Sequence, residues 1–112
     1  ASVSSELKGS SYHWYKSMDR EVAYALCGSL GPNIGTVDKG PRKDRFFVLS
    51  HTRVPSVLVE CAFMTNPSDI KILASAKYRQ KIAKRLAASI NYFLLNKNLA
   101  RRRFNNTGSD EE

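Results

Sequence analysis

The chain has 112 residues, which is enough for one domain with a hydrophobic core and too few for several. An apolar content of 42% and a charged content of 25% are ordinary for a globular protein. The net charge of +8 favours polyanionic surroundings, such as nucleic acid, anionic lipid or an acidic polymer. No segment approaches the roughly 18 consecutive apolar residues of a membrane span. The two cysteines are too few for a disulfide framework.

Residues 1–10 are small and polar, which predicts a flexible lead-in. They contain neither a basic segment nor an apolar core, so they do not resemble a signal peptide. The chain also lacks an initiator Met. We therefore expect it to be a piece of a longer protein.

Aromatic residues 11–15 predict a short strand, with Tyr12 and Trp14 on one face and His13 on the other. A helix capped by Ser17 follows and ends at Gly28 or Gly31. The stretch 31–41 is rich in Gly and Pro, which predicts a loop with a basic rim. Residues 46–49 predict a second short strand.

The run from Pro55 to Pro67 is apolar and β-branched, which predicts a buried strand. Glu60 lies in the middle of this run, next to Cys61. A carboxylate is rarely buried unless it is paired or has a function. The residues alone leave two interpretations open: a structural pair or cap for backbone N–H groups, and a catalytic carboxylate. Cys61 is predicted to be a buried thiol, although a single bridge to Cys27 stays open.

A short helix capped by Ser68 is predicted next, followed by a long amphipathic helix over residues 76–95. Apolar residues recur along that helix at steps of three and four, and its opposite side is basic. Such a side is typically a solvated face, and the alternative is a contact with an anionic polymer. Residues 96–112 predict a polar, charged and disordered tail. The element order predicts an α/β layer fold, with a mostly parallel sheet and flanking helices over residues 11–95.

The two histidines, His13 and His51, are predicted to be surface or satisfied core residues. A local zinc site formed by both of them with a cysteine stays open, but the spacing matches no standard zinc pattern.

Residues 54–60 (Val-Pro-Ser-Val-Leu-Val-Glu) and residues 63–66 (Phe-Met-Thr-Asn) stand in the same order as two segments of a known family. They resemble the Pro-Ala-Val-Leu-Val-Glu and Gly-Phe-Leu-Ser-Asn segments of the zinc-dependent N-acetylmuramoyl-L-alanine amidases of bacterial cell walls. Residues 38–40 are similar to an Asp-Arg-Gly turn of that family, and residues 78–93 to its closing helix. The resemblance covers residues 11–95 and the C-terminal half of the family domain. Ala62 departs from it, since the family usually has Gly there.

The resemblance implies a truncated amidase-like fold and hydrolysis of the amide between N-acetylmuramic acid and L-Ala of the stem peptide. In the family, a bound Zn²⁺ polarises the carbonyl and lowers the pKa of its water to about 7. Glu60 matches the catalytic Glu, which acts as general base and acid to that water. The three zinc ligands, two His and one Glu, lie upstream of the matched part. The resemblance therefore implies catalytic Glu60 without metal ligands, and we expect this chain alone to be inactive.

Peptidoglycan, a missing N-terminal half, and a place in the periplasm or cell envelope are the partners and location that the resemblance implies. It implies no specific nucleic acid. Two other hypotheses remain: a non-catalytic cell-wall-binding remnant, and a basic nucleic-acid-binding α/β domain.

Overall fold

The structure is a computed structural model that describes the backbone of residues 7–111 and the side chains of residues 7–98. Helices separate the strands along the chain, as in the α/β layer fold predicted from the sequence. The elements are β1 (Ser10–Trp14), α2 (Ser17–Leu26), α3 (Gly31–Ile34), β2 (Asp38–Lys43), α4 (Phe47–Ser50), β3 (Leu58–Glu60), α5 (Pro67–Ala74) and α6 (Ala76–Glu111).

The described strands form one sheet in the order β2-β1-β3, with β1 in the centre. β1 pairs with β2 in parallel and with β3 in antiparallel orientation, so the sheet is mixed where the sequence predicts a mostly parallel one. The connection from β1 to β2 runs through α2 and α3, which is the crossover that a parallel pair needs. The connection from β2 to β3 runs through α4 to the other edge of the sheet and reverses the strand direction, so the second pair is antiparallel.

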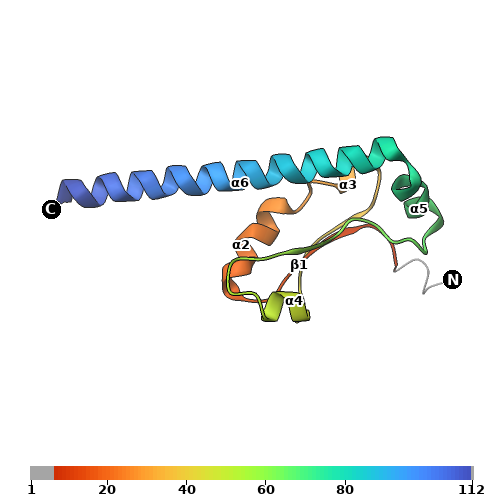
Figure 1. Ribbon diagram of the computed structural model, residues 1–112, viewed down its shortest axis with the longest axis horizontal. Coiled ribbons are helices and arrows are strands. Elements are labelled where there is room, and N and C mark those ends of the chain that lie inside the picture. The colour runs from red at the N-terminus through yellow and green to blue at the C-terminus, as the bar shows by residue number, and fades with distance from the viewer. Residues whose placement is uncertain (1–6, 112) are drawn as a thin grey trace.

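One face of the sheet is covered by helices (Figure 1). Tyr12 is fully buried beneath them, and its hydroxyl accepts a hydrogen bond of 3.1 Å from the backbone N–H of Leu30. Leu30 forms the core cluster with Ile34 and Ile82, so the core joins α3 to α6. α4 lies on the opposite side of the sheet from α6 (Figure 1). The helical layer therefore leaves the other sheet face open for polar side chains.

Helix α6 begins at Ala76 as predicted and turns Tyr78, Ile82 and Leu86 towards the core cluster. The helix continues to Glu111, whereas the sequence predicts a disordered tail from residue 96. The physical reason lies in the sequence itself, because residues 96–107 contain neither Pro nor Gly and so nothing that stops a helix. Within the described residues, no helix has the length and apolar character of a membrane span.

Two predictions about local structure are wrong. Residues 46–49 do not form a strand, because α4 makes a single helical turn there that buries Leu49 and leaves Phe47 exposed. A single turn is too short for its apolar pattern to distinguish a helix from a strand. The predicted loop contains α3 and most of β2, whose basic residues and internal Gly40 and Pro41 hide the usual strand pattern.

The predicted lead-in ends earlier than expected. Gly9 and Ser10 are buried, and the Ser10 N–H donates to the Val37 carbonyl at 2.7 Å. Gly9 has φ +88°, and a Cβ there would lie 2.2 Å from the Val37 oxygen, so this position requires glycine. Residues 1–6, which make up the rest of the predicted lead-in, lie outside the described residues. Asn66, rather than Ser68, caps α5 with its side chain.

Candidate active site

Glu60 lies on the sheet face that is turned away from the helical layer. In the antiparallel pairing of β3 with β1, Glu60 is opposite Ser11 and Val59 is opposite Tyr12. Because side chains alternate along a strand, Glu60 shares a face with Ser11 and His13, while Tyr12 points to the core. The Glu60 side chain is 36% exposed. The carboxylate therefore belongs to a polar face and is not buried within the apolar core.

A polar network holds the Glu60 carboxylate on this face. The Ser11 hydroxyl donates to Glu60 Oε2 at 3.4 Å, and His13 Nε2 lies 3.4 Å from the same oxygen. His13 Nε2 is also 2.8 Å from Ser11 Oγ. Behind them, His13 Nδ1 lies 2.6 Å from Asp44 Oδ2, and the Phe46 ring packs edge-on against the imidazole. A histidine that is 6% exposed thus connects two carboxylates.

The protonation of the His13 ring decides which atoms can donate to Glu60. With a proton on Nδ1, the ring donates to the Asp44 carboxylate. In the neutral ring Nε2 then accepts the Ser11 proton, and this hydroxyl has no second proton for Glu60. In the charged ring Nε2 donates, and Ser11 is released to donate to Glu60. The donors that face Glu60 Oε2 therefore differ between the neutral and the charged form of the ring.

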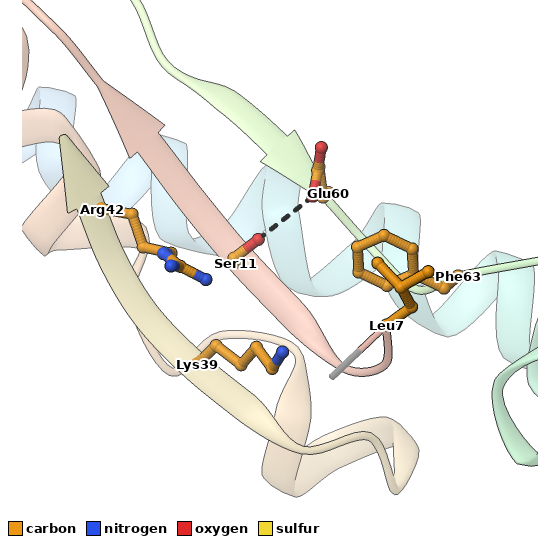
Figure 2. A pocket seen from close by; sticks show the side chains of 6 residues that line it. All are labelled: Leu7, Ser11, Lys39, Arg42, Glu60 and Phe63. Carbon is orange, nitrogen blue, oxygen red and sulfur yellow. Dashed lines mark hydrogen bonds between the residues drawn. The ribbon is translucent and has the colours of Figure 1, made fainter. Parts of the chain in front are cut away.

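The contacts from Ser11 to His13 to Asp44 follow the order of a Ser–His–Asp triad. Ser11 is only 2% exposed, however, and Figure 2 shows its hydroxyl directed along the sheet at Glu60. We interpret the three residues as support for Glu60, since a serine nucleophile needs an approach for the substrate carbonyl.

A pocket of about 370 Å³ opens in front of this network. Figure 2 shows the Arg42 and Lys39 side chains entering it from β2, with Glu60 on β3 across the central strand and Leu7 and Phe63 on the far side. The sequence had suggested only a basic rim for the β2 region. Arg42 lies here because it pairs with His13 in the β1–β2 register. Sequence patterns do not reveal this pairing.

Two buried carboxylates hold the segments at either end of β3. Before the strand, Asp19 Oδ1 accepts the Ser56 N–H at 2.9 Å. After the strand, Asp69 Oδ2 accepts the Phe63 N–H at 3.1 Å, and it also accepts the Gly9 N–H at 2.7 Å. Glu60 is therefore placed by backbone contacts on both sides of its strand.

The remaining candidate ligands are dispersed. His51 is exposed at the end of α4 and stacks on Phe47, and it lies outside the set of residues that line the pocket. Burial raises the pKa of both the Cys27 and the Cys61 thiol, which disfavours the thiolate that zinc requires. Both cysteines are free thiols. Among the residues that the structure describes, no three His, Cys, Asp or Glu side chains form a group that could hold a metal ion. The described residues therefore do not fit a zinc ion.

The fold and the site define an α/β domain with a hydrogen-bonded carboxylate at the edge of a pocket. The family model for N-acetylmuramoyl-L-alanine amidases matches residues 1–92. The chain belongs to this family of amidases, as the sequence resemblance predicts.

The amidases that are similar to this chain are longer than it is. N-acetylmuramoyl-L-alanine amidase LytC of Bacillus subtilis is 36% identical over 75 residues, which cover 66% of this chain and 15% of LytC. The probable cell wall amidase LytH of Staphylococcus saprophyticus is 29% identical over 90 residues, covering 80% of this chain and 31% of LytH. The solved amidase AmiC2 of Nostoc punctiforme superimposes with a TM-score of 0.73 at 31% identity, covering 80% of this chain and 49% of that one. The chain thus spans about half of the solved amidase and less of the two longer relatives.

Proposed function

We propose that this chain carries the Glu60 part of a peptidoglycan amidase site. The reaction is hydrolysis of the amide between N-acetylmuramic acid and L-Ala of the stem peptide. One observation carries the proposal: Glu60 is open to a pocket on one side and is held by Ser11 and His13 on the other. Membership of the amidase family supports the choice of bond.

In this reaction Glu60 acts first as a base and then as an acid. Its carboxylate takes a proton from the attacking water while the water oxygen bonds to the amide carbon. It then gives that proton to the nitrogen of L-Ala as the C–N bond breaks, so that an acid and a free amine are formed. The described contacts of Glu60 with Ser11 and His13 use Oε2, so in this proposal Oε1 is the oxygen that transfers the proton.

The zinc ion that the family resemblance implies would need ligands from outside residues 7–98. We propose that the rest of the domain, in the same polypeptide or in trans, provides them. The surface around β3 supports this, because Leu58 and Val59 are only partly buried and Val54 and Met64 are exposed. Apolar surface of this kind is typical of a face that another segment covers. The proposed substrate places the working protein at the cell envelope.

The proposal is tested by joining the full chain to the N-terminal part of the AmiC2 domain that it does not cover. The substrate is N-acetylmuramoyl-L-alaninamide, and the released L-alaninamide is measured by amine derivatisation and chromatography. We expect the hybrid to hydrolyse it, and Glu60→Gln to lower kcat by about 10²- to 10⁴-fold because the base is lost. Glu21→Gln, which changes an exposed carboxylate on α2, is the matched control and should keep parental activity.

A folded hybrid without activity, or a Glu60→Gln hybrid as active as its parent, would contradict the proposed role. The first result would favour the hypothesis of a non-catalytic cell-wall-binding remnant, and the second would assign the proton transfer to another residue.

A further inference from the structure

The wall of the Glu60 pocket that β2 forms is basic. Lys39 and Arg42 both line the pocket, and Figure 2 shows both side chains directed into it beside Ser11. Arg42 pairs with His13 in the parallel β1–β2 ladder, which puts it on the same sheet face as Glu60. Within the described part of the chain, Arg42 forms no ion pair. Its guanidinium is therefore available to a ligand.

Cationic side chains outnumber carboxylates among the residues that line the pocket. Lys39 and Arg42 are cationic, and Glu60 is the carboxylate of this set. The nearby carboxylates are engaged elsewhere, since Asp44 contacts His13 and Asp38 accepts from the Tyr12 hydroxyl and the Gly40 N–H. A concave site lined by more cationic than anionic side chains favours a negatively charged group. Arg in particular binds carboxylates through paired N–H donors.

The opposite wall is apolar. Leu7 and Phe63 line it, and Figure 2 shows them together across the pocket from Lys39 and Arg42. A volume of about 370 Å³ exceeds what a single amide group needs. The occupant therefore has a carboxylate on one side and an apolar portion on the other.

The chemistry of the substrate shows where such a carboxylate can come from. In a muramoyl peptide the carboxyl group of the sugar's lactyl arm is the acyl part of the amide that is cleaved. That group carries no charge, so the negative charge of this substrate lies in its peptide.

We infer that Lys39 and Arg42 bind a free carboxylate of the stem peptide on the C-terminal side of L-Ala. Leu7 and Phe63 contact the apolar portion of the same peptide. This inference rests on the proposed function, and it assigns to the β2 wall the recognition of acidic over amidated stem peptides.

The test measures binding to the full chain without added metal. The probes are N-acetylmuramoyl-L-alanyl-D-glutamate and the same compound with both carboxyl groups amidated. Affinities come from ¹H–¹⁵N chemical-shift titrations at low ionic strength, where charge contacts are least screened. We expect the acid to bind about tenfold more tightly than the diamide. Arg42→Gln should weaken binding of the acid about three- to tenfold and leave the diamide unchanged.

Lys43→Gln is the matched control, because it removes the same charge one residue further along β2. Lys43 lies on the other sheet face, with Nζ 5.5 Å from the centre of the Trp14 ring. Lys39→Gln is the second pocket variant and should act like Arg42→Gln. The amide spectrum of each variant shows directly whether it is folded.

The inference is overturned by equal affinities for acid and diamide, by no binding of either probe, or by equal losses in Arg42→Gln and Lys43→Gln. These outcomes are separate from the fate of the proposed function, since N-acetylmuramoyl-L-alaninamide has no carboxylate. A hybrid that hydrolyses this neutral substrate while the chain binds acid and diamide alike would remove only the carboxylate site.

Discussion

Asp19 connects helix α2 to the segment that leads into β3, and its replacement tests how Glu60 is positioned. The carboxylate is fully buried and accepts the backbone N–H groups of Lys16 and Ser56, both at 2.9 Å. The Lys16 ammonium lies 3.2 Å from it. In Asp19→Asn one oxygen becomes an NH₂ group that faces an N–H donor. The loss of a charge-assisted hydrogen bond (about 1.5–3 kcal/mol) and an unpaired buried donor (about 1–3 kcal/mol) predict a destabilisation of about 3 kcal/mol.

The effect of this substitution depends on pH. Burial by itself would raise the pKa of Asp19, but the hydrogen bonds from Ser56 and Lys16 and the Lys16 charge lower it below the ordinary value of 3.8. A carboxylate whose pKa is lower in the folded state stabilises that state above its unfolded pKa. The contribution is lost as the pH falls through the folded pKa. The stability difference between wild type and Asp19→Asn should therefore be complete near neutrality and narrow below about pH 4.

The measurement is urea unfolding followed by Trp14 fluorescence at about pH 7 and about pH 3, for wild type, Asp19→Asn and Glu21→Gln. Glu21→Gln removes an exposed carboxylate from the same helix and should change stability by less than about 0.5 kcal/mol. A loss of unfolding free energy below about 1 kcal/mol in Asp19→Asn at neutral pH would refute the contribution assigned to the Asp19 hydrogen bonds. A loss of the same size at both pH values would refute the argument from the lowered pKa.

Two further predictions concern the core. Ile82→Ala should destabilise by about 2–5 kcal/mol, and Leu86→Ala by less, because Ile82 is 8% exposed and Leu86 is only partly buried. Equal losses in denaturant unfolding would contradict the assigned face of α6. Tyr12→Phe should cost about 1–2 kcal/mol, since its hydroxyl bonds Leu30 N–H and Asp38. Burial raises the Tyr12 pKa, so wild type should lose this stability as the pH rises through that raised pKa, whereas Tyr12→Phe should not. Parallel curves of unfolding free energy against alkaline pH for the two proteins would contradict this.

The parts of the fold that the sequence predicts are those with a strong local pattern. The apolar repeat of α6 is long enough to define a helix and its buried side, and the β1 aromatics alternate as expected. β2 escapes prediction because its basic side chains serve the pocket and carry no apolar alternation. His13 is confirmed as a satisfied core histidine, through Asp44. Its contact with Glu60 depends on strand pairing between distant segments, which no local pattern encodes.

The face on which Glu60 lies depends on the register between β1 and β3. A shift of one residue would move Glu60 to the side of Tyr12 and the helices, and Val59 to the pocket. Asp69 works against such a shift, because one of its oxygens accepts N–H groups from Gly9, just before β1, and from Phe63, just after β3. A single buried carboxylate at the start of α5 thus fixes the adjacent ends of two antiparallel strands. The apolar run around Glu60 agrees with this register. Only every second side chain of the strand faces the core, and the register puts the Glu60 carboxylate on the open face.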